Sequence, residues 1–226
     1  MKNYIAIVVL IILLMSKNST IAQENTNQFD GNGKRTGVWE KFYNNKRIRY
    51  RGQFEAGKEV GVFKFYSALN SEHPIAIKTF DKSSSIADVK FYNEQGVLES
   101  KGNMDGKKRQ GKWLYYHTDG ETIMSEENYV DGVLNGATKT YYNSGEITEI
   151  LFYSKGKLHG NAKRYDTNGA LVSELTYENG KLHGLAKYFN TDGKLMYTGN
   201  YENDVKTGKW EYFENGKQEN VNKFKQ

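Results

Sequence analysis

Two histidines in the same local sequence are the first candidates for chemistry in this chain of 226 residues. His159 and His183 each stand between a leucine and a glycine, and Asn135 holds the related position in another segment. A zinc site takes three or four ligands from Cys, His and carboxylates, whereas the chain has no Cys and four His. We therefore interpret both histidines as polar turn residues and expect no metal site.

Carboxylates offer no better candidates for catalysis. The segment at Asp30 resembles a calcium loop, but it lacks the carboxylate series and the final Glu of such a loop. Glu126 and Glu127 are adjacent, so a strand would direct them to opposite faces, which is poor geometry for an acid/base pair. With no nucleophile–base motif and no phosphate-binding glycine loop, we expect a protein that is not an enzyme and needs no cofactor.

A repeat of about 24 residues accounts for most of the sequence. Each unit begins with a small residue that is followed five places later by an aromatic. The units start at Gly37, Gly61, Ala87, Gly111, Gly136, Gly160, Gly184 and Gly208. The aromatics are Phe42, Tyr66, Tyr92, Tyr116, Tyr141, Tyr165, Phe189 and Phe213. A fixed period of this length indicates an extended array of repeats, which leaves little room for a catalytic domain.

One unit predicts two strands. Residues 160–165 form the first, a turn follows with Asn168-Gly169 supplying positive φ angles, and residues 170–177 form the second. The second strand alternates with a period of two, which is typical of β structure. In the first unit Trp39 and Phe42 are three apart, so a flat strand would place them on opposite faces; a bulge or burial of both faces would reconcile them.

The predicted fold is all-β: about eight tandem β-hairpins that form one elongated, twisted antiparallel sheet. Residues near Phe29 resemble the end of a missing unit, which predicts an N-terminal half-repeat. The last predicted strand, residues 218–224, is polar and charged, as expected of a protected sheet edge. Residues 67–77 and 82–86 interrupt the period, and we expect a loop or kink there.

The N-terminal segment has the pattern of a signal peptide. Lys2, an apolar run and small residues before a cut after Ala22 are typical of export. An uncleaved membrane anchor is the alternative. We assign residues 1–22 to the leader, 23–36 to a linker with the half-repeat, and 37–226 to the array with its C-terminal capping strand. Cleavage would reduce the net charge from +5 to +3, since two lysines leave, and we expect no nucleic-acid partner.

The repeat resembles the variant MORN repeat. Residues 111–120, residues 208–216 and residues 177–184 carry the resemblance, which extends from about Phe29 to the C-terminus. It implies consecutive hairpins in a twisted, grooved sheet, and interaction with proteins or lipids in place of catalysis. Bacterial chains of this kind are grouped as YwqK-type antitoxin proteins. The leader is not typical of a cytoplasmic antitoxin and fits an immunity protein against a toxin that acts in the envelope.

Residues 113–116 also resemble the aromatic hairpins of choline- or glucan-binding wall repeats, although the chain has only three Trp. Three functions therefore remain open: an exported module that binds or scaffolds a protein or envelope component, an immunity protein or antitoxin, and a glycan- or choline-binding repeat. A protein is the favoured partner, with an envelope lipid or glycan as the alternative. The candidate binding surface consists of Trp113, Tyr115, Tyr188, Trp210 and Tyr212.

Overall fold

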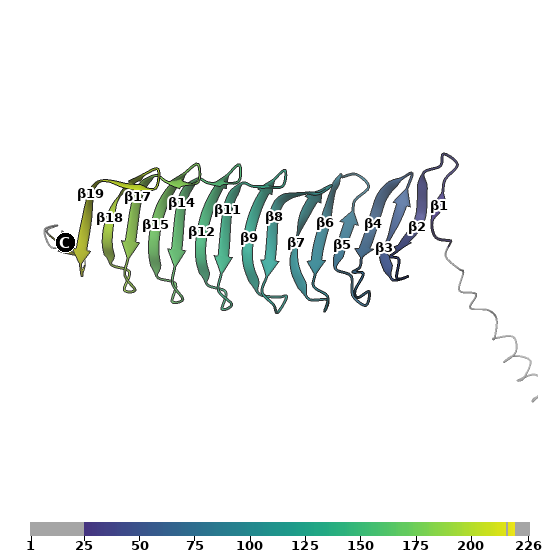
Figure 1. Ribbon diagram of the computed structural model, residues 1–226, viewed down its shortest axis with the longest axis horizontal. Coiled ribbons are helices and arrows are strands. Elements are labelled where there is room, and N and C mark those ends of the chain that lie inside the picture. The colour runs from purple at the N-terminus through teal and green to yellow at the C-terminus, as the bar shows by residue number, and fades with distance from the viewer. Residues whose placement is uncertain (1–24, 216, 220–226) are drawn as a thin grey trace, which may run out of the picture.

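The computed structural model describes residues 25–215 and 217–219. The predicted leader and most of the predicted last strand lie outside these ranges. The described chain forms one antiparallel sheet of 20 strands with no helix. The main strands succeed one another in chain order along the long axis, so the molecule is an elongated ribbon (Figure 1). This confirms the prediction of an all-β sheet of tandem hairpins.

The strands of the first half lie on the N-terminal side of residue 131. They are β1 (Gln28–Phe29), β2 (Arg35–Phe42), β3 (Ile48–Glu55), β4 (Lys58–Phe65), β5 (Ala76–Phe80), β6 (Ile86–Tyr92), β7 (Leu98–Asp105), β8 (Lys108–Tyr116) and β9 (Ile123–Val130). The second half contains β10 (Val133–Leu134), β11 (Gly136–Tyr141), β12 (Ile147–Ser154), β13 (Lys157–Leu158), β14 (Gly160–Tyr165), β15 (Leu171–Glu178), β16 (Lys181–Leu182), β17 (Gly184–Phe189), β18 (Leu195–Glu202), β19 (Val205–Glu214) and β20 (Lys217–Gln218).

The two long edges of the ribbon use different turns. At one edge Asn179-Gly180 links β15 to β16, and both residues have positive φ (51° and 90°), as in a two-residue type I′ hairpin. At the other edge the Asp166 carboxylate accepts hydrogen bonds from the backbone N–H of Asn168 and Ala170. Among these turn residues only Gly169 has positive φ (79°). The prediction that Asn168 also adopts positive φ was wrong, because the Asp166 side chain holds the turn.

The type I′ turns stack on one another along the ribbon. The Gly132 N–H donates to the Arg109 carbonyl at 2.9 Å, and the Gly156 N–H donates to the Leu134 carbonyl at 2.8 Å. The Gly180 N–H makes the same bond to Leu158. A lone hairpin is marginal in water, so these bonds between successive units help each hairpin to stabilise the next.

A β-bulge precedes the fifth-place aromatic in most units. The strand register shifts between Lys41 and Phe42, between Arg164 and Tyr165, and at the same place in four other hairpins. The extra residue lets Trp39 face one side of the sheet while Phe42 is still accommodated at the strand end. Of the two explanations that the sequence left open, the bulge is the one observed.

One face of the sheet, called the aromatic face, carries the core. In the middle of this face, a large side chain on one strand fills the space left by a small residue on the neighbouring strand. A Cβ on Gly102 would lie 2.5 Å from the Trp113 ring, and a Cβ on Gly199 would lie 2.3 Å from the Trp210 ring. Where a unit has alanine in place of tryptophan, as at Ala162, the ladder places Leu175 opposite it. The sheet therefore buries its core with single side chains that lie over neighbouring backbone.

The irregular region contains the predicted loop, and a short strand lies at the N-terminal end. Residues 66–75 form a loop between β4 and β5, and residues 81–85 form a turn before β6. At the N-terminal end β1 pairs with β2 over two residues. The Asn27 amide oxygen also accepts a hydrogen bond from the Glu40 backbone N–H at 2.9 Å, so this short segment covers part of the outer edge of β2.

The ring-over-glycine packing predicts the cost of one methyl group. We expect Gly102→Ala to lower the free energy of unfolding by about 1–3 kcal/mol, because fully buried Trp113 has no room to move aside. Gly31→Ala is the matched control, since nothing lies within 4 Å of its added Cβ. Urea unfolding of both variants checks this prediction, and equal midpoints would contradict the packing described.

Candidate functional site

Three of the predicted site residues share one row of the aromatic face. Ladder partners connect Tyr115 of β8, through Ser125, Thr140, Glu149, Arg164 and Ser173, to Tyr188 of β17. The row continues through Tyr197 to Tyr212 of β19. We call Tyr115, Tyr188, Tyr197 and Tyr212 the tyrosine row. All four rings are half-buried, so each presents an edge or face to solvent.

Trp113 and Trp210 lie on the same face, two residues before Tyr115 and Tyr212. Trp113 is 0% exposed and Trp210 is 8% exposed. Trp113 therefore has no exposed surface that a partner could contact. The tyrosines beside it are half-exposed. Tyr115 lies 6.3 Å from Trp113 between ring centroids, and Tyr197 lies 6.2 Å from Trp210.

A cation covers each tryptophan. The Arg109 guanidinium lies 4.9 Å from the Trp113 ring centroid, and the Lys206 amino group lies 4.1 Å from that of Trp210. Arg35 covers Trp39 in the same way at 5.2 Å. Sequence reasoning missed these cations, although the signal was present. In each of these units Arg or Lys stands two places before the glycine and Trp stands two places after it.

The five predicted site residues belong to two separate ring clusters. The first, the Trp113 cluster, consists of Phe91, Trp113, Tyr115 and Tyr129. The second, the Trp210 cluster, consists of Tyr188, Tyr197, Tyr201, Trp210 and Tyr212. Six strand steps separate β8 from β17, which corresponds to about 29 Å at about 4.8 Å per step. The structure therefore divides the five predicted site residues between two sites on one face.

Hydrogen bonds fix the polar ends of the rings. The Tyr115 and Tyr129 hydroxyls lie 3.3 Å apart, and the Tyr129 hydroxyl donates to the Glu127 carboxylate. In the Trp210 cluster the Tyr188 and Tyr201 hydroxyls lie 3.4 Å apart. Desolvation, and then the hydrogen bond to Tyr129, raises the pKa of Tyr115. Desolvation, and then the hydrogen bond to Tyr201, raises the pKa of Tyr188.

A polar region lies between the two clusters. Glu149 and Arg164 form an ion pair there at 3.0 Å. Beside them a cavity of about 260 Å³ has Ala162 and Ser173 among its lining residues, with Leu175 alongside. The small side chains open this hollow between the bulky clusters, so the aromatic face is not one continuous apolar surface.

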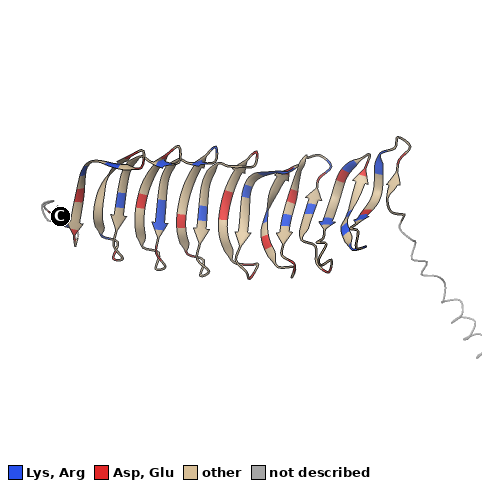
Figure 2. Ribbon diagram, in the orientation of Figure 1, with Lys and Arg blue, Asp and Glu red and all other residues tan. Residues whose placement is uncertain are grey.

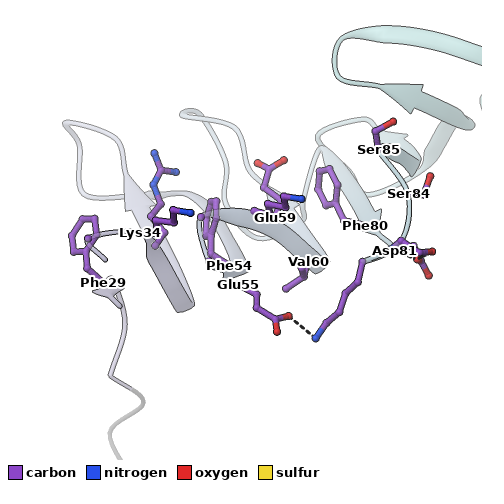
Figure 3. Close-up of a pocket in the computed structure, with 17 residues that line it drawn as sticks. Phe29, Lys34, Phe54, Glu55, Glu59, Val60, Phe80, Asp81, Ser84 and Ser85 are labelled. Carbon is purple, nitrogen blue, oxygen red and sulfur yellow. Dashed lines mark hydrogen bonds and ion pairs between the residues drawn. The ribbon is translucent and has the colours of Figure 1, made fainter. Parts of the chain in front are cut away.

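A larger groove occupies the N-terminal units. It measures about 1120 Å³ and is lined by Phe29, Phe54 and Phe80 from three strands, with charged residues of both signs around them (Figure 3). The turn at residues 81–85 forms part of its wall, and Lys82 pairs with Glu55 in the same groove. The break in the repeat period therefore lies beside this large hollow.

The residues first considered for chemistry have structural partners. The backbone N–H groups of Asn135, His159 and His183 donate at 2.8–2.9 Å to carbonyls of the preceding main strand, which confirms that the three positions are equivalent. Within residues 25–215 and 217–219, no three His, Cys, Asp or Glu side chains gather as metal ligands. In the same part of the chain, no helix is long and apolar enough to span a membrane.

Comparison with protein families identifies the repeat. The model of the MORN repeat variant matches residues 134–155, 158–179 and 182–203. Each match begins at a leucine two places before a unit glycine and ends at the first residue of the next type I′ turn, namely Lys155, Asn179 or Asn203. The matched units are those with a small residue, and not tryptophan, two places after the glycine.

Other comparisons add little. No curated protein matches the sequence. Among solved structures, a mutant of S. aureus TarM in complex with fondaparinux, α-GlcNAc-glycerol and UDP overlaps 58% of this chain at 10% identity, with a TM-score of 0.27. This chain spans about a fifth of the length of that chain, since 21% of it is covered. The overlap is too poor to support any argument about fold or function.

The raised tyrosine pKa values predict how stability depends on pH. In the folded chain the phenols of Tyr115 and Tyr188 keep their protons above the ordinary pKa of 10.0, whereas the unfolded chain releases them near that value. Their contribution is therefore complete below about pH 10 and is lost as the pH rises further. Tyr129, Tyr141, Tyr153 and Tyr177 shift in the same direction.

We expect the melting temperature of the wild type to fall above about pH 10. The double variant Tyr115→Phe/Tyr188→Phe should fall less steeply, because it removes two of the groups that ionise. Thermal unfolding from about pH 8 to about pH 11 measures both slopes. Parallel curves for the two proteins would show that these phenols do not titrate as described.

Proposed function

Because residues 134–203 are three MORN repeat variants, and such repeats mediate interactions with proteins or membrane lipids, we propose that this protein is an exported, non-catalytic binding module for a protein partner. The observation that carries the proposal is the tyrosine row. Half-exposed rings lie along a rigid sheet, with the hydroxyls of Tyr115 and Tyr188 held by neighbouring tyrosines.

The chemistry of these rings favours a protein over a small ligand. Tyrosine and tryptophan are enriched at the energetic centres of protein interfaces. A ring held by stacking loses little freedom on binding, and Tyr188 stacks on Tyr197 with ring centroids 4.5 Å apart. Two clusters separated by about 29 Å also suit an extended surface better than one compact molecule.

The test compares two double variants that differ only in which face they alter. Tyr188→Ala/Tyr212→Ala removes two rings of the tyrosine row. Lys187→Ala/Glu211→Ala changes the adjacent residues, whose side chains project from the opposite face. Immobilised protein would be cross-linked to an envelope fraction, and each retained protein would be identified and quantified by mass spectrometry.

We expect the wild type and the Lys187/Glu211 variant to retain one common partner. The Tyr188/Tyr212 variant should retain at least about tenfold less of it, as expected for the loss of interface hot spots. Thermal unfolding of both variants shows that each is folded. The proposal fails if the two variants retain the partner equally, or if the wild type retains none above background.

Export through a cleaved leader is part of the proposal. It rests on Lys2, the apolar run that follows and the small residue Ala22, all outside the described residues. We expect the protein recovered from the envelope or medium of cells expressing the full chain to begin at Gln23. Intact-mass measurement tests this, and recovery of a chain that still starts at Met1 would contradict cleavage.

A further inference from the structure

The face opposite the aromatic face carries one continuous row of ladder partners. The row, which we call the charged row, runs from β2 to β19. Its members are Glu40, Arg51, Lys64, Ile77, Lys90, Lys101, Leu114, Glu126, Lys139, Ile150, Lys163, Glu174, Lys187, Thr198 and Glu211. Neighbouring members are about 4.8 Å apart.

In the C-terminal half, charges of opposite sign lie next to each other in this row. Lys163 and Lys187 flank Glu174 at 3.3 Å and 3.7 Å between charged atoms. Along the ribbon as a whole, where the residues of both faces are coloured, bands of both signs alternate from β9 to β17 (Figure 2). Cross-strand pairs of opposite charge stabilise a sheet, so the charges around Glu174 stabilise one another.

In the N-terminal half, the same row places like charges together. Lys90 and Lys101 are direct ladder partners, and Arg51 is the direct partner of Lys64. Glu40 pairs with Arg51 at 2.6 Å. In the described part of the chain Lys64, Lys90 and Lys101 make no ion pair, and Lys101 only approaches the Tyr116 ring at 5.4 Å. Like charges directly opposite each other destabilise a sheet.

A hollow of about 410 Å³ lies at these lysines. Lys90, Lys101 and Lys112 line it together with Leu114 and a single carboxylate, Asp88. Lys112 is already paired with Glu126 at 2.7 Å, and Asp88 accepts a hydrogen bond from the Asn103 amide in its favoured orientation. Among the described residues, Asp88 is thus the one carboxylate that lines this hollow, and neither Lys90 nor Lys101 forms an ion pair with it.

We propose that this stretch of the charged row, from Lys64 to Leu114, is a second binding surface that takes an extended acidic segment of a protein. Carboxylates of the segment would lie between Lys90 and Lys101 and beside Lys64. This surface is on the opposite face from the tyrosine row and does not depend on it.

The row itself favours a peptide over a simple anion. Ile77 and Leu114, both half-buried, interrupt the lysines, so the partner must bring apolar groups between its charges. Lys64 to Leu114 spans four strand steps, about 19 Å, which an extended segment of about six residues covers. A free phosphate has no apolar groups, and it spans only one of these steps.

The test uses a synthetic peptide of about ten residues that contains Glu, Leu and Ser, together with the same peptide in which Gln replaces Glu. We expect the mature protein to bind the Glu peptide and not the Gln peptide, with affinity falling as salt is raised from about 50 to about 500 mM. Fluorescence anisotropy of a labelled peptide measures both. Failure of the Glu peptide to bind at low salt would overturn the proposal.

The decisive variant is Lys101→Glu, which gives the N-terminal half the alternation seen around Glu174. We expect it to weaken binding of the Glu peptide at least about tenfold, and to raise the melting temperature because Lys90 gains an opposite charge. Lys163→Glu is the matched control on the same face. It should lower the melting temperature by breaking the Glu174 pair and leave peptide binding unchanged.

Other outcomes point to other occupants and overturn the proposal. One is binding to vesicles that contain anionic phospholipid without binding to the Glu peptide. Another is displacement of the peptide by inorganic phosphate at low millimolar concentration. Equal affinity of wild type and Lys101→Glu would also reject it. Tyr188→Ala/Tyr212→Ala should bind the peptide normally, so this test remains informative even if the aromatic face binds nothing.

Discussion

The structure depends on how a sheet one layer thick can bury a core. No second layer covers either face in the described chain, so the only material that can exclude water is the side chains of the sheet itself. Trp113 achieves complete burial by lying over Gly102 of the neighbouring strand, with Arg109 above it. Where a unit has alanine in place of tryptophan, as at Ala162, Leu175 lies opposite it on the next strand. Packing density is thus maintained by pairs of residues in different strands.

This dependence on neighbours explains why the repeat is strict in some places and loose in others. The bulge before Tyr165 and the type I′ turn at Asn179 set the register and the stacking of successive units. A change in either would displace the small–large pairs that form the core. Packing constrains the residue types of the charged row less strongly, because its side chains reach into water. The N-terminal and C-terminal halves of the ribbon differ in this row.

The two faces suit different kinds of contact. Beyond the N-terminal rings around Phe63, the aromatic face offers two rigid clusters separated by the polar region at Glu149 and Arg164. The opposite face offers a line of charge whose pattern changes near β9. An elongated sheet displays both surfaces over its full length, which a globular domain of the same size could not do. The N-terminal groove at Phe54 and Phe80 adds a third feature, next to the segment where the period breaks.

The sequence by itself determined the repeat length, the hairpin order, the alternation within the second strand and the position of the irregular loop, because each follows from local spacing and turn chemistry. It also placed Tyr115, Tyr188 and Tyr212 as candidates. Only the tertiary structure decided that they share a row with Tyr197, that Trp113 is fully buried, and that Lys90 faces Lys101. These facts depend on which residues of different strands become partners. A bulge in nearly every hairpin shifts that register by one residue, and a shift of one residue moves a side chain from one face to the other.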